Sequence, residues 1–326
     1  MEQERIHYID VAKGLAILIV VLGHCTATTL GPHSRLFYTI YSFHMPFWFF
    51  LSGMLYSTKN WQLFFSGKVK SLLLPYLFFF TINVISFRLL SLLNYPQFHI
   101  YVKFGGLWFL LALFYVVISY FVLDIYCFKK LSEIKRRVVL TLLSFSFLIV
   151  GFYGGKDLPF SAFSTDMVCF FFFHIGVLIR KFKGNMNFKT NRDRSIVLGV
   201  SLILIVILAY TAPINPEPVD VNWGRYGNKV LFLVQALLGI WGFLLLAAAI
   251  KKNNIIEYLG RNSLLILVLH IPLWQIFDTL FSIVGILGYV RLSCEFICVS
   301  ILTLLFLIPV NTFIPELKGN FKFDKK

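Results

Sequence analysis

Ten apolar segments, most of them about 20 residues long, alternate with short polar stretches through the chain. A helix that crosses the hydrocarbon core of a bilayer needs roughly 20 apolar residues. Its backbone groups must bond within the segment, so such runs fold as helices. The sequence therefore predicts an all-α integral membrane protein, a bundle of about ten transmembrane helices. We expect the spans at 9–30, 36–56, 72–94, 105–126, 138–152, 163–181, 195–213, 228–250, 263–283 and 292–314.

Composition supports the membrane class and argues against nucleic-acid binding. Apolar residues make up 58% of the chain, more than the roughly 45–50% of soluble domains. The net charge of +15 comes from basic residues that lie in short segments between apolar runs, which is the pattern of a membrane protein. No linker is long enough to separate domains, so residues 1–326 are expected to form one transmembrane domain.

The distribution of Lys and Arg predicts the orientation. With a cytoplasmic N-terminus, 22 of the 30 basic residues fall in cytoplasmic segments and six fall outside. The remaining two, Lys13 and Arg88, lie within spans. By the positive-inside rule both termini are cytoplasmic. The first eight residues are polar and no cleavage site follows them closely, so the first span is expected to be retained.

The first span carries an acid, a base and an imidazole: Asp10, Lys13 and His24. On a helix, Lys13 and His24 lie about 16 Å apart along the axis and within about 20° of one face. A charge at the centre of a membrane helix costs roughly 2.5–3.5 kcal/mol, so a polar stripe there is a functional-site hypothesis. The alternative is a cytoplasmic helix end plus one packed histidine.

Counting residues from the span ends gives an expected depth for each polar side chain. His24 and His44 fall at about the same level in the outer half, on neighbouring antiparallel spans. Arg261 and His270 fall toward the cytoplasmic side, so His270 is expected to lie far from His24 in depth. Pro46 follows His44 by two residues, as Pro272 follows His270, and each proline favours a kink beside its histidine. Packing alone is the alternative for both histidines, and His174, within a run of phenylalanines, is expected to be core.

Several motifs together resemble the acyltransferase-3 family of integral membrane acyltransferases. They occur in order from the first span to the ninth. The motifs are Ile9-Asp10-Val-Ala-Lys13-Gly14 with Gly23-His24; Phe43-His44-Met-Pro46 running to Leu51-Ser52-Gly53; Lys68-Val-Lys70 with Pro75-Tyr76; Leu107-Trp108-Phe109-Leu110; and Leu259-Gly260-Arg261-Asn262-Ser263 with Leu269-His270-Ile-Pro272. The branch that the chain resembles is that of sugar O-acetyltransferases without an extra extracytoplasmic domain.

The resemblance implies transfer of an acyl group, usually acetyl, from cytoplasmic acetyl-CoA to a hydroxyl of a cell-surface or lipid-linked glycan. It also implies a multi-pass protein of a bacterial-type cytoplasmic membrane. The family's catalytic histidine falls on His24, its basic residue on Lys13, and its basic cluster for CoA on Lys68 and Lys70. A family arginine three residues before the proline is replaced by Leu72, so bidentate phosphate recognition is missing there.

Acyl transfer to a hydroxyl needs a base and stabilisation of an oxyanion. We expect His24 to act as the base or as a transient acyl carrier, with His44 orienting it or donating to the intermediate. Asp10 and Lys13 would pair and help position the acyl-CoA, and Arg261 joins Lys68 and Lys70 as candidate phosphate contacts. No metal is expected, because the five cysteines show no metal-ligand spacing.

Two other classes of function remain open. Intramembrane charges and kinked helices also mark secondary transporters, although the chain shows no matching halves. A non-catalytic subunit that passes acyl groups to a separate enzyme is the second alternative. The acceptor sugar, the acyl length and the formation of a homo-oligomer stay undetermined by the sequence.

Overall fold

The computed structural model describes residues 7–57, 60–92, 107–154, 161–180, 188, 190–250 and 252–313. Their regular structure is helical, apart from one isolated bridge between Asp220 and Arg225. The helices are α1 (His7–Thr29), α2 (Arg35–Tyr41), α3 (His44–Met54), α4 (Trp61–Lys68), α5 (Leu74–Leu92), α6 (Trp108–Val122), α7 (Glu133–Tyr153), α8 (Ser161–Ile179), α9 (Asn191–Thr211), α10 (Lys229–Ala249), α11 (Asn254–Arg261), α12 (Ser263–Val284) and α13 (Gly288–Phe313). Short π-helical turns η1 (Val69–Leu73) and η2 (Leu123–Cys127) follow α4 and α6, and 3-10 turns η4 (Ala212–Ile214) and η5 (Val221–Trp223) follow α9.

The all-α membrane bundle is confirmed. Within the described residues, eight helical segments are long and apolar enough to cross a membrane, and they overlap eight of the ten predicted spans. The sixth predicted span corresponds to α8, whose apolar stretch Phe163–Ile179 is shorter. The side chain of Arg88 and both ends of the chain lie outside the described residues, as does Lys59.

The second predicted span is broken into α2 and α3. The break falls at Ser42 and Phe43, where Phe43 leaves helical geometry with φ −138°. Pro46 then lies in the first turn of α3, where its missing N–H has no intrahelical partner to lose. The proline therefore sits just after an interruption rather than at a kink inside one long helix.

Residues 57–71 were expected to lie between the second and third spans, but the structure is helical from Trp61 onward. Helix α4 begins there because Asn60 caps it, accepting a hydrogen bond from the backbone N–H of Gln62 at 2.9 Å, and because Phe64 is buried. Lys68 ends α4 and Lys70 lies in η1, so both lysines belong to a helical segment that continues into α5. The third span accordingly begins earlier than the sequence suggested.

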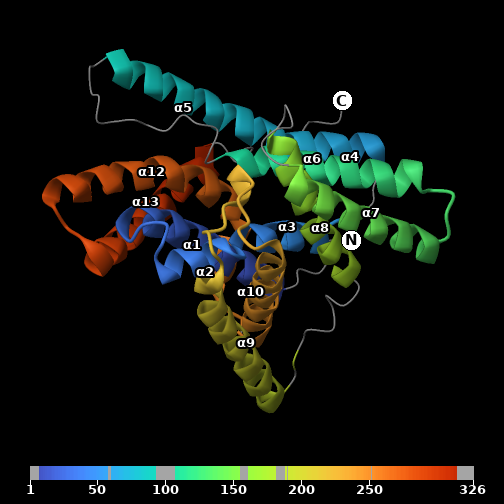
Figure 1. Ribbon diagram of the computed structural model, residues 1–326. Coiled ribbons are helices and arrows are strands. Elements are labelled where there is room, and N and C mark those ends of the chain that lie inside the picture. Colours follow the sequence, from blue (N-terminus) through green and yellow to red (C-terminus); the bar gives the residue numbers. More distant parts are fainter. Residues whose placement is uncertain are drawn as a thin grey trace.

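Helix α1 lies in the middle of the bundle and packs against α2, α3, α10, α11, α12 and α13 (Figure 1). Its tightest neighbour is α11. A Cβ on Gly14 would stand 2.2 Å from the carbonyl oxygen of Ile256, and one on Gly260 would stand 1.9 Å from that of Asp10. Only glycine permits this approach, so the two helices are fixed in one register.

The other long helices form pairs around this centre. Figure 1 shows α9 beside α10, and α12 beside α13, as antiparallel hairpins. Helices α3 and α8 also meet closely, because a Cβ on Gly53 would stand 2.0 Å from the carbonyl oxygen of Phe173. The connection between α9 and α10 contacts α2 through η4 and α8 through η5. It therefore covers the end of the bundle at which α1 runs into α2.

Candidate active site

His24 of α1 faces the neighbouring helix α12 rather than the bundle exterior. Its ring centroid lies 5.3 Å from that of His270 and 5.3 Å from that of Trp274, with tilted planes. His270 is fully buried, and His24 is half-buried. The structure thus places two imidazoles and an indole together where α1 meets α12.

The prediction that His270 lies far from His24 in depth is wrong. The depth estimate assumed that the first and ninth spans begin at the same depth in the membrane. In the structure, Gly260 packs closely against the turn of α1 from Asp10 to Gly14. Helix α12 consequently begins beside the second turn of α1. His270, seven residues into α12, then lies with its ring centroid 5.3 Å from that of His24.

The hydrogen bond of His270 identifies the nitrogen that can accept a proton. Its Nδ1 lies 2.9 Å from the carbonyl oxygen of Ile266, one turn earlier. A carbonyl only accepts, so Nδ1 carries the hydrogen and Nε2 holds the lone pair in the neutral ring. Nε2 is buried and has no hydrogen-bond partner in the described structure. It is a nitrogen with a lone pair, buried beside His24.

His44, at the start of α3, has the same arrangement. Its Nδ1 lies 2.9 Å from the carbonyl oxygen of Ile40, and its ring meets Tyr41 edge-on at 4.7 Å. Ile40 also touches α1, because its side chain lies 3.0 Å from the position of a Cβ on Gly23. The break between α2 and α3 therefore brings His44 toward the turn of α1 that carries His24.

A buried ionic cluster joins α12 to α13 farther along α12. Arg291 of α13 pairs with Asp278 of α12 and donates to Ser282 at 2.8 Å, and its Nε lies 3.5 Å from the carboxylate of Glu295. Glu295 is fully buried. His270, Trp274 and Asp278 are spaced four residues apart, so α12 presents one polar face to α1 and α13.

Trp274 was missed by the sequence interpretation, although a signal was present. The spacing of four from His270 through Trp274 to Asp278 marks one helix face. The indole Nε1 is buried without a hydrogen-bond partner in the described structure. An indole N–H can only donate, so this group is available to an oxygen that enters the site.

The candidate residues for the acyl donor fall into two groups. Asp10 and Lys13 approach each other at 3.9 Å on α1, and Arg261 lies on the adjoining α11, 3.5 Å from the buried Glu257. The α1–α11 crossing therefore brings the first group together. Lys68 and Lys70 form the second group, on the segment from α4 to η1 that packs against α5 and α6.

A family model described as Acyltransferase domain matches residues 6–312 of the 326. No match was found among curated proteins or among solved structures. Within the described part of the chain, no group of three or more His, Cys, Asp or Glu side chains is placed to hold a metal ion.

Proposed function

Since the chain belongs to the acyltransferase-3 family of membrane acyltransferases, we propose that it moves an acetyl or other short acyl group from acyl-CoA to a hydroxyl of a cell-surface or lipid-linked glycan. The observation that carries this proposal is the grouping of His24, His270 and Trp274 between α1 and α12. It combines basic nitrogens with a donor in a largely closed site, which acyl transfer requires.

His24 takes the proton from the acceptor hydroxyl as its oxygen attacks the thioester carbonyl. The Nε1–H of Trp274 donates to the oxyanion of the tetrahedral intermediate. When the intermediate collapses, the C–S bond breaks and the proton passes from His24 to the leaving CoA thiolate. Transient acylation of His24 is the variant of this route in which the imidazole itself attacks first. His44 orients His24 or stabilises the intermediate in either route.

The acyl-CoA approaches from the cytoplasmic face, where the Lys and Arg excess is expected. Lys13, which pairs with Asp10, lies on the same helix as His24. In this proposal the Lys13 end of α1 is near the cytoplasmic face and the His24 end is near the imidazoles. Arg261, Lys68 and Lys70 supply cations for the phosphates of CoA. The protein is expected to be a multi-pass protein of a bacterial-type cytoplasmic membrane, working as a single domain with a lipid-linked or surface glycan as its partner.

The test is acyl transfer by the purified full-length chain carrying His24→Ala. A positioned base contributes typically 10²–10⁴-fold, so the rate of acetyl transfer from acetyl-CoA should fall by about that factor. His33→Ala is the matched control, because His33 is exposed in the α1–α2 connection and should leave the rate unchanged. A His24→Ala protein that inserts normally and keeps near-wild-type rate contradicts the mechanism.

The same assay separates the proposal from its two alternatives. An acyl-passing subunit would need a second protein, and a transporter would leave acetyl-CoA intact. Mass analysis of surface glycans from cells with and without the protein identifies the acceptor, since an acetyl ester adds a fixed mass to the glycan that carries it. If the purified chain neither cleaves acetyl-CoA nor acetylates any glycan from its own cell, the enzyme assignment to this chain alone fails.

A further inference from the structure

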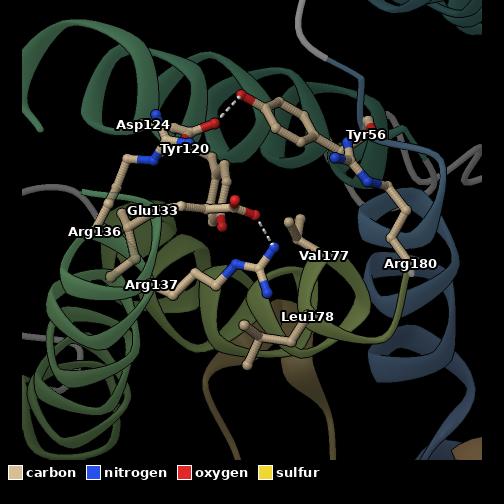
Figure 2. Close-up of a pocket in the computed structure, with 10 residues that line it drawn as sticks. Tyr56, Tyr120, Asp124, Glu133, Arg136, Arg137, Val177, Leu178 and Arg180 are labelled. Carbon is tan, nitrogen blue, oxygen red and sulfur yellow. Dashed lines mark hydrogen bonds and ion pairs between the residues drawn. The ribbon is translucent and has the colours of Figure 1, made fainter. Parts of the chain in front are cut away.

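A second polar region lies away from the imidazoles, at the ends of α3, α6, α7 and α8 (Figure 2). It surrounds a cavity of about 130 Å³. Its charged lining consists of Asp124, Glu133, Arg136, Arg137 and Arg180. These residues belong to or adjoin the segments that hold the Lys and Arg excess, which we call the basic face. The residues that line the cavity come from α3, α6, α7 and α8 and the turns that follow them, not from α1 or α12.

One side of the cavity is fixed by a buried ionic network. Asp124 lies 3.1 Å from Nε of Arg136 and accepts a hydrogen bond from the Tyr56 hydroxyl at 3.1 Å. Asp124 is almost fully buried, so the pair is anchored to the helix ends. Arg136 is thereby held in place and its charge is balanced.

The other two guanidinium groups are differently engaged. Arg180 donates to the backbone carbonyl of Tyr56, a neutral acceptor, so no carboxylate balances its charge through that contact. Arg137 pairs with Glu133, and Figure 2 shows the Glu133 carboxylate reaching into the space between the arginines. That pair is 40% and 58% exposed, and exposed ion pairs contribute only about 0–1 kcal/mol. An anion that binds Arg137 more strongly than this exposed pair can therefore compete with the Glu133 carboxylate for the guanidinium.

Size and chemistry both favour a phosphate group. The cavity is roughly ten times the 10–15 Å³ that one water needs. Three guanidiniums outnumber two carboxylates in its lining, and guanidinium forks bind phosphate bidentately. Basic pockets between helices on the cytoplasmic side of membrane proteins bind lipid phosphates. We propose that this cavity is a binding site for a phosphate-bearing ligand, held by Arg137 and Arg180, separate from the imidazole site and beyond the proposed transfer reaction.

The experiment measures binding to the full-length protein in detergent by thermal unfolding at constant ionic strength. Two probes distinguish the source of the phosphate: inorganic pyrophosphate stands for a soluble ligand, and dioctanoyl phosphatidic acid stands for a lipid headgroup. Saturable stabilisation by either one supports the site. The probe that binds more tightly shows whether the phosphate belongs to a soluble ligand or to a lipid headgroup.

Three variants tie the binding to the cavity. A hydrogen bond to a charged group is worth about 1.5–3 kcal/mol, so Arg137→Gln and Arg180→Gln should each weaken the apparent Kd about tenfold or more. Glu133→Gln removes the competing carboxylate and should tighten binding. Arg192→Gln is the matched control, because Arg192 is exposed on the same face at the start of α9 and does not line the cavity.

The proposal is overturned if neither probe stabilises the protein. It is also overturned if the affinities of Arg137→Gln, Arg180→Gln and Arg192→Gln are equal. Should an arginine variant fail to fold, Glu133→Gln still decides, since weaker or unchanged binding in that variant contradicts the proposal. His24→Ala should bind both probes as the wild type does, so failure of this site and failure of the transfer mechanism are read separately.

Discussion

Two buried histidines of this bundle differ in how their ring nitrogens are used. His174 of α8 is bonded on both sides: Nδ1 lies 3.0 Å from the Tyr120 hydroxyl, and Nε2 lies 2.9 Å from the Thr141 hydroxyl. His270 of α12 is bonded on one side only, to a carbonyl of its own helix. Both are almost completely buried, so burial does not separate them.

The difference separates a fully hydrogen-bonded group from one whose second nitrogen has no partner in the described structure. Buried polar groups in native proteins are nearly always hydrogen-bonded, and an exception needs an explanation. His174 meets this rule and joins three helices through hydroxyl groups. His270 Nε2 and Trp274 Nε1 do not meet it in the described structure, and both belong to the group around His24. Under the proposed transfer reaction, a bound substrate supplies the missing partners.

The largest expected effect comes from exchanging these two histidines for alanine. His270→Ala should lower the rate of acetyl transfer about 10²-fold and change its pH profile, because the ring whose centroid lies 5.3 Å from that of His24 no longer positions it. His174→Ala should leave both nearly unchanged and lower the free energy of unfolding by about 1–3 kcal/mol, because two hydroxyls lose their partner. The steady-state rate and the thermal unfolding of both alanine variants test this prediction. Equal losses of rate in the two variants would remove the distinction.

Much of this comparison could be predicted from the sequence. Apolar run length indicated the helices, and the isolated polar residues of α1 pointed to the helix that carries the candidate site. The burial of His174 in the core was predicted from its phenylalanine neighbours. The position of His270 could not be predicted, because depth counting takes spans as straight and level. The cause of the error is α11, eight residues long and too short to be counted as a span.

Helix α11 has two signals in the sequence, a capping residue and a helical spacing of apolar residues. Asn253 caps it through Oδ1, which accepts from the backbone N–H groups of Ile255 and Ile256 at 3.1 Å. Apolar residues at 255, 256 and 259 then follow the helical spacing. A single sequence does not show which helix packs against Gly260. That contact depends on the backbone path of α1, so the second imidazole of the site could be found only from the fold.

A smaller effect is expected from Gly260→Ala. The added methyl would overlap the Asp10 carbonyl oxygen, and such overpacking typically costs about 1–3 kcal/mol. The shift of α12 should separate His270 from His24 and reduce the transfer rate, while the His174 network stays intact. Gly199→Ala is the control, since a Cβ there meets no neighbour. Thermal unfolding and rate together test this, and a Gly260→Ala protein indistinguishable from Gly199→Ala would show that the crossing does not set the site.

The smallest expected effect concerns the loop that covers the α2 end of the site. Burial raises the pKa of Asp220 in that loop to about 6, against 3.8 for a free side chain. Between about pH 4 and pH 6 the folded chain keeps a proton that the unfolded chain has lost. This contribution to stability is therefore complete below about pH 4 and is lost as the pH rises through 6.

Asp220→Asn should abolish this pH dependence while keeping the oxygen that faces the backbone N–H of Trp223. The expected change in Tm across the window is about 2–4 °C for each kcal/mol involved. Unfolding curves at pH 4.5 and 6.5 measure it. A wild-type protein that becomes more stable over this interval, with the asparagine variant following it, would contradict the assignment.

The bonds from His44 and His270 to carbonyl oxygens of their own helices have one more consequence. A ring that relays a proton takes it at one nitrogen and releases it from the other. In both residues the second nitrogen is already committed to the backbone. Each imidazole can therefore store a proton and return it on the same side, but it cannot act as a link in a proton wire. Neither His44 nor His270 therefore offers a path by which a proton could pass along the bundle.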